Sequence, residues 1–323
     1  MRARTRLFGT TLVVVVVVAL SACGPTGDDS EFVTPTANPV YPEVRTYPEI
    51  PVIEDIPYVD RDGTPQLLDA CFPGDADIDD PSSPPRPVIV SIHGGSWMHG
   101  DKANINWRSV CQWFASEGFV AVSINYRLVP DAVFPAQLDD VQDAVRWLRS
   151  PAQVRRYNID PDRIGAFGGS AGGNLAALAG LYGAGSVAAD ARVAAVASLS
   201  GPADLREPIP TTDSYNQDFA QVQLAYVGCT SFDGCSGAAA ASPVTLIDPS
   251  DPPFFVAHST EEFIPLSQSQ ALVTALRASG VDTTFVTVEG SLHSIAMLDD
   301  DMRARVIAFF RTKLGQNAAE LAR

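Results

Sequence analysis

A glycine-rich turn between a strand and a helix constrains this chain more than any other feature. The motif G-G-S-A-G at residues 168–172 has the form G-x-S-x-G. Residues 163–167 before it are mostly apolar and alternate like a strand, and apolar residues at helical spacing follow from Ala171. Such a turn holds its serine in a strained backbone conformation, with the hydroxyl exposed above the sheet. The helix N-terminus directs N–H groups at the same point, so we predict that Ser170 is a nucleophile.

The N-terminal residues predict export. Residues 1–22 combine three arginines with an apolar run that includes six consecutive valines. This run is too short to span a bilayer comfortably and is typical of a signal peptide. The Leu-Ser-Ala-Cys sequence that ends at Cys23 resembles the lipobox of bacterial lipoproteins, although an ordinary cleavage site beside a cysteine would read the same. We therefore expect Cys23 to carry acyl chains such as palmitate and to anchor an exported domain at the cell membrane.

The rest of the chain predicts a tether followed by one α/β domain. Residues 23–51 are rich in Pro, Thr, Asp and Glu and have no apolar period, which is typical of a disordered linker. Strand and helix patterns alternate over residues 52–316, and they predict a mostly parallel eight-stranded sheet flanked by helices. Residues 202–253 interrupt this alternation, and we expect them to form a small, irregular cap over the site. The expected strands are 53–59, 66–72, 88–92, 119–125, 163–167, 193–199, 254–258 and 283–289, and the expected helices, besides the one after Ser170, are 106–117, 135–149, 266–279 and 299–314.

Charge and cysteine content narrow the partners and cofactors. The formal net charge of −16 argues against nucleic acid as a partner. Four cysteines remain when Cys23 is set apart, and four cysteines allow three pairings. Because an exported domain can form disulfides and the last two cysteines close a short loop, we expect the disulfides Cys71–Cys111 and Cys229–Cys235. Neither cysteine pair has a histidine at ligand spacing, so we expect no metal. We also expect no organic cofactor, because acyl transfer by a serine, a histidine and an acid requires none.

A serine nucleophile needs a general base, and the chain has four histidines. His93 begins an H-G-G sequence that presents backbone N–H groups, and His99 follows in the same loop with no evident role. His258 ends a strand just before a pair of glutamates. His293 lies between the last strand and the last helix, and in hydrolases with this turn the base is the last of the three residues in the chain. These positions assign the base to His293.

The acid that orients this histidine is expected after the penultimate strand. That turn contains no aspartate, so a glutamate must serve, and Glu261 and Glu262 are both available. We prefer Glu262 from its distance to the strand end and keep Glu261 as the alternative.

The chain resembles the α/β-hydrolase esterases of the hormone-sensitive-lipase and acetyl-xylan/feruloyl-esterase (BD-FAE-like) type. The resemblance implies the α/β-hydrolase fold. It also implies an oxyanion hole that follows His93 and Gly94 and uses the backbone N–H groups of Gly95, Ser96 and Ala171. Two departures stand out, because Ser96 replaces the usual third glycine and a glutamate replaces the usual aspartate. The matching sequences are HGGSW at 93–97, NYRL at 125–128, FPAQ at 134–137, DPDRI at 160–164, GGSAGG at 168–173 and GSLH at 290–293.

These inferences predict a serine carboxylesterase that hydrolyses small-molecule esters with short to medium acyl groups through an acyl-enzyme. Deacylases of polysaccharide acetyl or feruloyl esters, arylformamidases and exopeptidases use the same motifs, so they remain alternatives. A hydrolase-like protein without activity that only binds is a more remote alternative.

Overall fold

The computed structural model describes residues 45–74, 83–211 and 219–315, which all belong to one compact unit. The predicted signal peptide, Cys23 and most of the predicted tether lie outside the described residues. Among the described residues, no helix has the length and hydropathy needed to cross a membrane.

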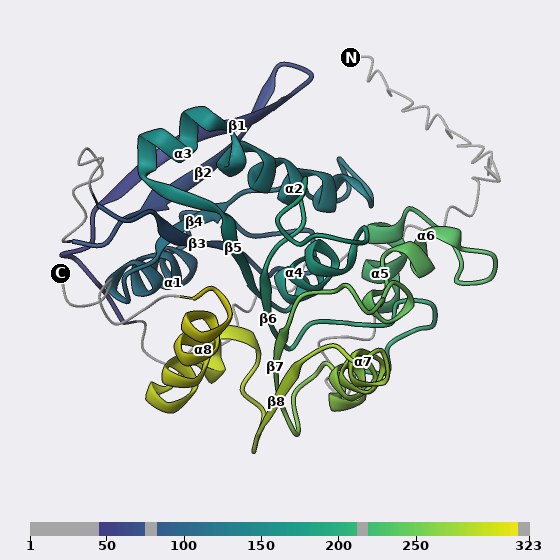
Figure 1. The fold of residues 1–323 in the computed structure, drawn as a ribbon. Helices are drawn as coiled ribbons and strands as arrows, with labels where there is room; N and C mark the ends of the chain where they lie inside the picture. Colours follow the sequence, from purple (N-terminus) through teal and green to yellow (C-terminus); the bar gives the residue numbers. More distant parts are fainter. Residues whose placement is uncertain (1–44, 75–82, 212–218, 316–323) are drawn as a thin grey trace, which may run out of the picture. The chain divides into compact units, whose positions relative to one another are not determined.

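A single eight-stranded sheet with the order β1-β2-β4-β3-β5-β6-β7-β8 forms the centre of the domain (Figure 1). β1 pairs antiparallel with β2 and β2 antiparallel with β4, whereas all the other neighbours are parallel. The predicted mostly parallel sheet is therefore confirmed. The strands are β1 (Val52–Arg61), β2 (Thr64–Cys71), β3 (Arg86–Ile92), β4 (Val120–Ile124), β5 (Ile159–Gly169), β6 (Ala195–Leu199), β7 (Phe254–Ser259) and β8 (Thr283–Val288).

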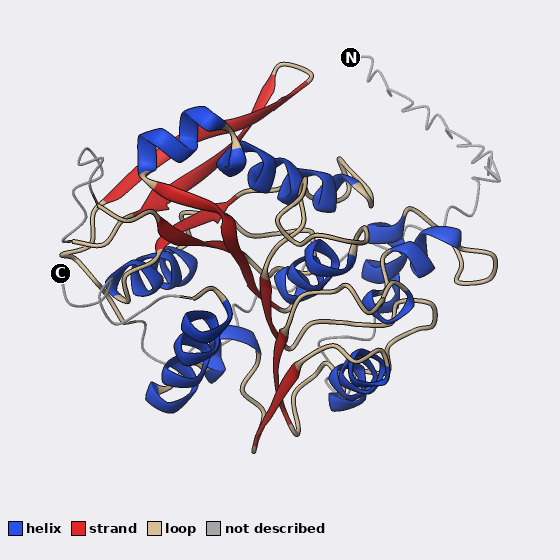
Figure 2. Ribbon diagram, viewed as in Figure 1, coloured by secondary structure: helices blue, strands red, loops and turns tan. Residues whose placement is uncertain are grey.

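Helices cover both faces of this sheet (Figure 2). The central strands are buried on both faces, and their successive side chains enter different cores. In β3, Val88 and Val90 belong to the apolar core that also contains residues of α2, α4 and α7, whereas Ile89 belongs to the core that contains residues of α1 and α8. The larger helices are α1 (Ile105–Ser116), α2 (Ala136–Arg149), α4 (Ala171–Leu181), α7 (Leu266–Ala278) and α8 (Asp300–Lys313).

Three short helices were not expected from the sequence. α3 (Pro151–Tyr157) follows α2 after a single residue, Ser150, whose backbone is extended. The residue after α3, Asn158, has the left-handed conformation and ends the helix. α5 (Phe219–Val227) and α6 (Ser236–Ala240) lie in the segment that was expected to be irregular. Helices of this length leave few turns over which an apolar period can be recognised.

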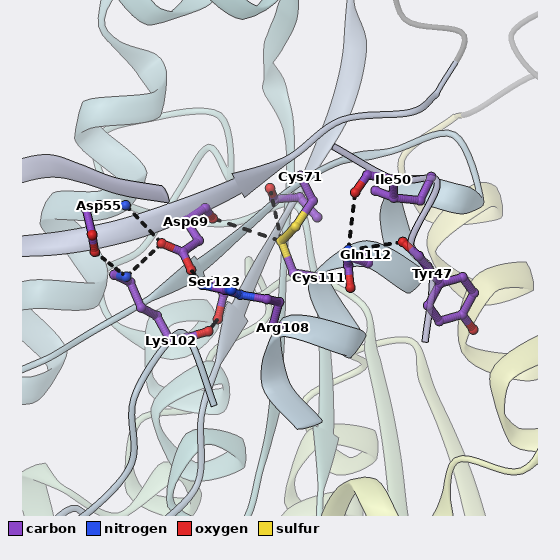
Figure 3. The surroundings of a disulfide bond; sticks show 11 residues. Tyr47, Ile50, Asp55, Asp69, Cys71, Lys102, Arg108, Cys111, Gln112 and Ser123 are labelled. Carbon is purple, nitrogen blue, oxygen red and sulfur yellow. Dashed lines mark hydrogen bonds and ion pairs between the residues drawn. A yellow bond between two sulfur atoms is a disulfide. The ribbon is translucent and has the colours of Figure 1, made fainter. Parts of the chain in front are cut away.

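Two disulfides are present, with the expected pairing. Cys71 and Cys111 join β2 to α1, with an S–S distance of 2.14 Å, and Cys229 and Cys235 close a loop in the cap segment. Figure 3 shows that Cys71–Cys111 lies beside a buried ion-pair cluster around Asp69. The disulfide and the charged cluster together hold the first strands of the sheet against α1.

Residues 45–51, which the sequence assigned to the tether, pack against α1. Ile50 is 5% exposed, and the Gln112 side-chain amide donates to the backbone oxygens of Tyr47 and Ile50 (Figure 3). Burial of Ile50 gives this short, Pro-containing stretch a fixed position that its composition did not predict.

Candidate active site

Ser170 lies at the junction of β5 and α4. Its backbone has φ 58° and ψ −127°, a strained conformation, and its N–H donates to the Leu199 oxygen at 2.8 Å. The glycine two residues later allows the turn to approach β3, because a Cβ on Gly172 would lie 2.1 Å from the Ile92 oxygen. The strand-to-helix turn is thus packed so closely that it excludes side chains.

His293 reaches the same region from the loop after β8. Gly169 and Ser294, the neighbours of Ser170 and His293, are in contact, since a Cβ on Gly169 would lie 2.0 Å from Ser294 Oγ. The Ser294 N–H also donates to Ser200 Oγ at 3.0 Å. The structure therefore places the predicted nucleophile and the predicted base in the same region, although they are 123 positions apart in the sequence.

Backbone hydrogen bonds join the loop after β7 to the loop after β8. Thr260 N–H donates to the Val288 oxygen at 2.9 Å, and Glu261 N–H donates to the Gly290 oxygen at 2.8 Å. With these loops joined, the Glu261 side chain points to solvent, whereas Glu262 is buried. His293 Nδ1 hydrogen-bonds to Glu262 Oε2.

The Glu262 carboxylate is held in its charged form. Burial by itself would raise the pKa of this carboxyl group, but hydrogen bonds from His258 and His293 outweigh burial and lower the pKa to about 2. A carboxylate that stays ionised near neutral pH can fix the ring orientation of His293 and stabilise its imidazolium form.

His258 is a site residue that sequence reasoning left without a role. Its side chain is fully buried, and its Nε2 lies 2.9 Å from Glu262 Oε1, on the opposite side of the carboxylate from His293. The sequence offered one signal, since His258 lies four residues before Glu262. That spacing, however, does not show that both side chains turn inward from a loop.

The loop after β3 lies on the other side of Ser170. His93 is buried and stacks on Tyr126 with ring centroids 4.2 Å apart, and burial lowers the pKa of His93 to about 4. The Tyr126 hydroxyl donates to the His93 backbone oxygen at 2.9 Å. A Cβ on Gly94 would lie 3.2 Å from Ser170 Cβ, so the backbone of this loop passes next to the serine. His93 therefore supports the loop as a neutral, packed ring.

Three consecutive residues of this loop have positive φ: Gly95 at 120°, Ser96 at 55° and Trp97 at 58°. Among the hydrogen bonds between described residues, none uses the N–H of Gly95, Ser96 or Ala171 as its donor. These N–H groups are the ones that the sequence assigned to an oxyanion hole. His99, by contrast, has an exposed side chain.

A buried lysine anchors the far end of the same loop. Lys102 Nζ lies 2.7 Å from both Asp55 Oδ1 and Asp69 Oδ1 (Figure 3). Burial alone would lower the pKa of Lys102, but these two ion pairs raise it. The Lys102 N–H also donates to Asn125 Oδ1 at 2.6 Å. The loop is therefore fixed at both ends.

The segment expected to be a cap packs on this loop and on α4. Tyr226 of α5 stacks on Trp97 with ring centroids 4.0 Å apart and interplanar angle 4°. Its hydroxyl lies 3.3 Å from Asn174 Oδ1, and the Asn174 amide donates to the Pro202 and Ala241 oxygens at 2.9 and 3.1 Å. Side-chain contacts thus connect the cap segment to both elements that flank Ser170.

In the part of the chain that the structure describes, no group of three or more His, Cys, Asp or Glu side chains is arranged to bind a metal ion. The chemistry that the described residues can supply is nucleophilic attack, proton transfer by imidazole and hydrogen bonding by free N–H groups.

Comparison with known proteins identifies similar chains. Residues 76–276 match the BD-FAE family model. Esterase LipC of Mycobacterium tuberculosis is 31% identical over 251 residues, which are 74% of this chain and 61% of that protein. Esterase LipQ of the same organism is also 31% identical, over 229 residues. The match covers 61% of LipC and 53% of LipQ, so the chain spans about half to three fifths of the length of these curated relatives.

Solved structures with the same arrangement of elements cover most of the chain. A truncated form of a carbohydrate esterase from gut microbiota has a TM-score of 0.69 at 23% identity, covering 82% of this chain and 97% of that one. A butyrate-bound esterase, Est2 of the Planctomycetes species Thermogutta terrifontis, has a TM-score of 0.65 at 25% identity, covering 84% and 96%.

Proposed function

The chain belongs to the BD-FAE family and has the α/β-hydrolase fold, and from this premise we propose that it is a serine carboxylesterase. The observation that carries the proposal is the buried Glu262 carboxylate, which is hydrogen-bonded to His293 beside the strained turn at Ser170. An ionised acid, an oriented imidazole and an adjacent serine are the three groups that nucleophilic acyl transfer requires.

In the proposed acylation step, Ser170 Oγ attacks the ester carbonyl carbon while His293 Nε2 takes the hydroxyl proton. Glu262 stabilises the imidazolium ion that results. The negative charge on the tetrahedral oxygen is accepted by the N–H groups of Gly95, Ser96 and Ala171, which have no partner among the described residues. Collapse of the tetrahedral intermediate breaks the ester C–O bond, and His293 returns its proton to the departing alcohol.

Deacylation repeats the same steps with water. His293 removes a proton from the water as its oxygen attacks the acyl carbon. When the second tetrahedral intermediate collapses, the bond between the acyl carbon and Ser170 Oγ breaks and His293 returns the proton to Oγ, which releases the carboxylic acid and restores the serine hydroxyl. The residues act in the same roles in both halves, so their loss is expected to affect turnover far more than substrate binding.

We propose esters with short to medium acyl groups as the substrates. Support comes from LipC, which carries the name esterase, and from Est2, whose solved structure contains butyrate. Rates on p-nitrophenyl acetate, butyrate and octanoate, measured beside acetylated xylan and N-formylkynurenine, separate this proposal from a polysaccharide deacylase and an arylformamidase. Fastest turnover on either of the last two would replace it.

Replacement of Ser170 by alanine tests the enzyme assignment. We expect kcat on p-nitrophenyl butyrate to fall by about 10⁴ or more, with the thermal unfolding temperature retained, because the nucleophile is lost and the packing is not. Ser267→Ala is the matched control, since this serine is exposed. A Ser170→Ala protein that keeps more than a tenth of the activity would refute the proposal, and a wild-type protein without activity would favour a binding role.

We also propose that Cys23 anchors the exported domain at the cell membrane, on the basis of the Leu-Ser-Ala-Cys sequence and the preceding apolar run. Mass spectrometry of the mature N-terminus is expected to find acyl chains on Cys23, and Cys23→Ala is expected to release the protein from the membrane fraction. An unmodified mature N-terminus would contradict the anchor and leave the enzyme assignment unaffected.

A further inference from the structure

His258, at the end of β7, has hydrogen-bond partners at both ring nitrogens. Nδ1 lies 2.7 Å from Ser269 Oγ on α7, and Nε2 lies 2.8 Å from the Ile264 backbone oxygen and 2.9 Å from Glu262 Oε1. The side chain is 0% exposed, so water does not compete for these contacts. A buried imidazole with every polar atom engaged has a defined orientation and a defined hydrogen position.

The partners determine which nitrogen carries the hydrogen. The Ile264 carbonyl and the ionised Glu262 can only accept hydrogen bonds, so Nε2 must be the donor to both. The Ser269 hydroxyl can donate, which lets Nδ1 act as an acceptor. The contacts of His258 therefore require a hydrogen on Nε2.

The hydrogen bond from His258 holds Oε1 of Glu262, the carboxylate oxygen that His293 does not contact. Glu262 Oε2 accepts from His293, while Oε1 accepts from His258 and, at 3.4 Å, from the Ser259 backbone N–H. A glutamate has one more rotatable bond than an aspartate, so a single hydrogen bond to His293 leaves it more conformations to lose. Donors at both oxygens stop rotation of the carboxylate and define the point at which His293 Nδ1 meets it.

We propose that His258 is a positioning residue, which acts on the reaction by holding Glu262 through Nε2 and not by touching the substrate. The inference rests on the proposed function, in which Glu262 orients the catalytic base His293. A positioning role differs from a simple packing role in one respect. Turnover should depend on a hydrogen-bond donor at the position of Nε2 and not on the rest of the ring.

Two substitutions of similar polarity separate these roles. In His258→Gln the side-chain amide nitrogen reaches the place of Nε2 and can donate to both Ile264 and Glu262. In His258→Asn the amide reaches the place of Nδ1, near Ser269, and falls short of Glu262. We expect His258→Asn to lower kcat on p-nitrophenyl butyrate about 100-fold with KM changed by less than about three-fold, because a misplaced catalytic group costs turnover. We expect His258→Gln to retain a tenth or more of wild-type kcat.

Equal losses of kcat in the two folded variants would overturn the proposal and leave His258 a packing residue.

A second measurement needs no substitution and no activity. With four histidines in the chain, ¹⁵N-histidine labelling resolves each ring, and the wild-type His258 signal is expected to show a hydrogen on Nε2. Hydrogen on Nδ1 alone would overturn the proposal even if neither variant folds. Retained activity in Ser170→Ala would refute the proposed function and leave this hydrogen assignment standing.

Discussion

The two sides of the site at Ser170 are built by different means. The turn at residues 168–173 and the loop at 93–97 are shaped by backbone, with glycines where the chains approach within van der Waals distance and positive φ at Ser96 and Ser170. The side formed by the loops after β7 and β8 is shaped by buried side-chain hydrogen bonds that converge on Glu262.

The difference indicates how each side fails. A backbone-built turn is damaged by added atoms, because its neighbours are main-chain atoms that cannot rotate away. A side chain-built pair is damaged by lost hydrogen bonds, because the groups left behind are buried and cannot be rehydrated. Substitutions that add volume should therefore affect the first side, and substitutions that keep shape but remove charge should affect the second.

Among substitutions that keep Ser170, the largest effect is expected from Glu262→Gln, which keeps the shape of the side chain and removes its charge. Because the neutral amide no longer stabilises the His293 imidazolium, kcat is expected to fall by about 10⁴, as in a related triad. Glu261→Gln is the matched control: its exposed side chain should leave kcat within a few-fold. Steady-state kinetics of both variants gives the comparison, and loss of activity in Glu261→Gln instead would transfer the role to that residue.

The same carboxylate predicts a pH dependence of stability. Its pKa in the folded protein is about 2, below its ordinary value of 4.5, so its stabilising contribution is present above about 4.5 and is lost as pH falls toward 2. The difference in unfolding free energy between wild type and Glu262→Gln should thus be largest near neutral pH and narrow in acid. A difference that does not change with pH would contradict a depressed pKa.

A smaller effect is expected from Gly172→Ala on the backbone-built side. The added Cβ would lie 2.1 Å from the Ile92 oxygen and 2.6 Å from the His93 oxygen, so α4 must shift away from β3. We expect about 1–3 kcal/mol of destabilisation and a fall in kcat of about 100-fold as Ser170 moves. Gly74→Ala is the control, because a Cβ there meets nothing closer than 3.9 Å. Full activity in Gly172→Ala would show that the backbone around the turn can move to accommodate the added Cβ without displacing Ser170.

The smallest effect is expected from Ser96→Gly. Ser96 has φ 55°, which glycine adopts without steric cost, but glycine also gives the unfolded chain more freedom. These opposing terms leave a change in unfolding free energy of at most about 1 kcal/mol, and kcat should stay within a few-fold because the backbone N–H is retained. Urea unfolding measures the first quantity. A large loss of activity would mean that the Ser96 hydroxyl takes part in the reaction.

Much of the fold followed from hydropathy alone. The central strands are buried on both faces, and their continuous apolar runs marked them within a few residues, apart from the start of β5, which lies at Ile159. The short helices α5 and α6 were missed because contacts stabilise them more than local preference does. Tyr226 of α5, for example, is placed by its stack on Trp97, more than a hundred residues earlier in the chain.

For the site, the sequence by itself determined the turn at Ser170 and the position of His293. The turn requires glycines at fixed spacing, and the order of the residues along the chain leaves one histidine after the last strand. The sequence left Glu261 and Glu262 as alternatives and gave His258 no role. Only the tertiary structure shows which glutamate lies beside His293, because the hydrogen bonds that join the loops after β7 and β8 leave Glu261 exposed and Glu262 buried. Packing of β7 against α7 then brings His258 to the oxygen of Glu262 that His293 does not use.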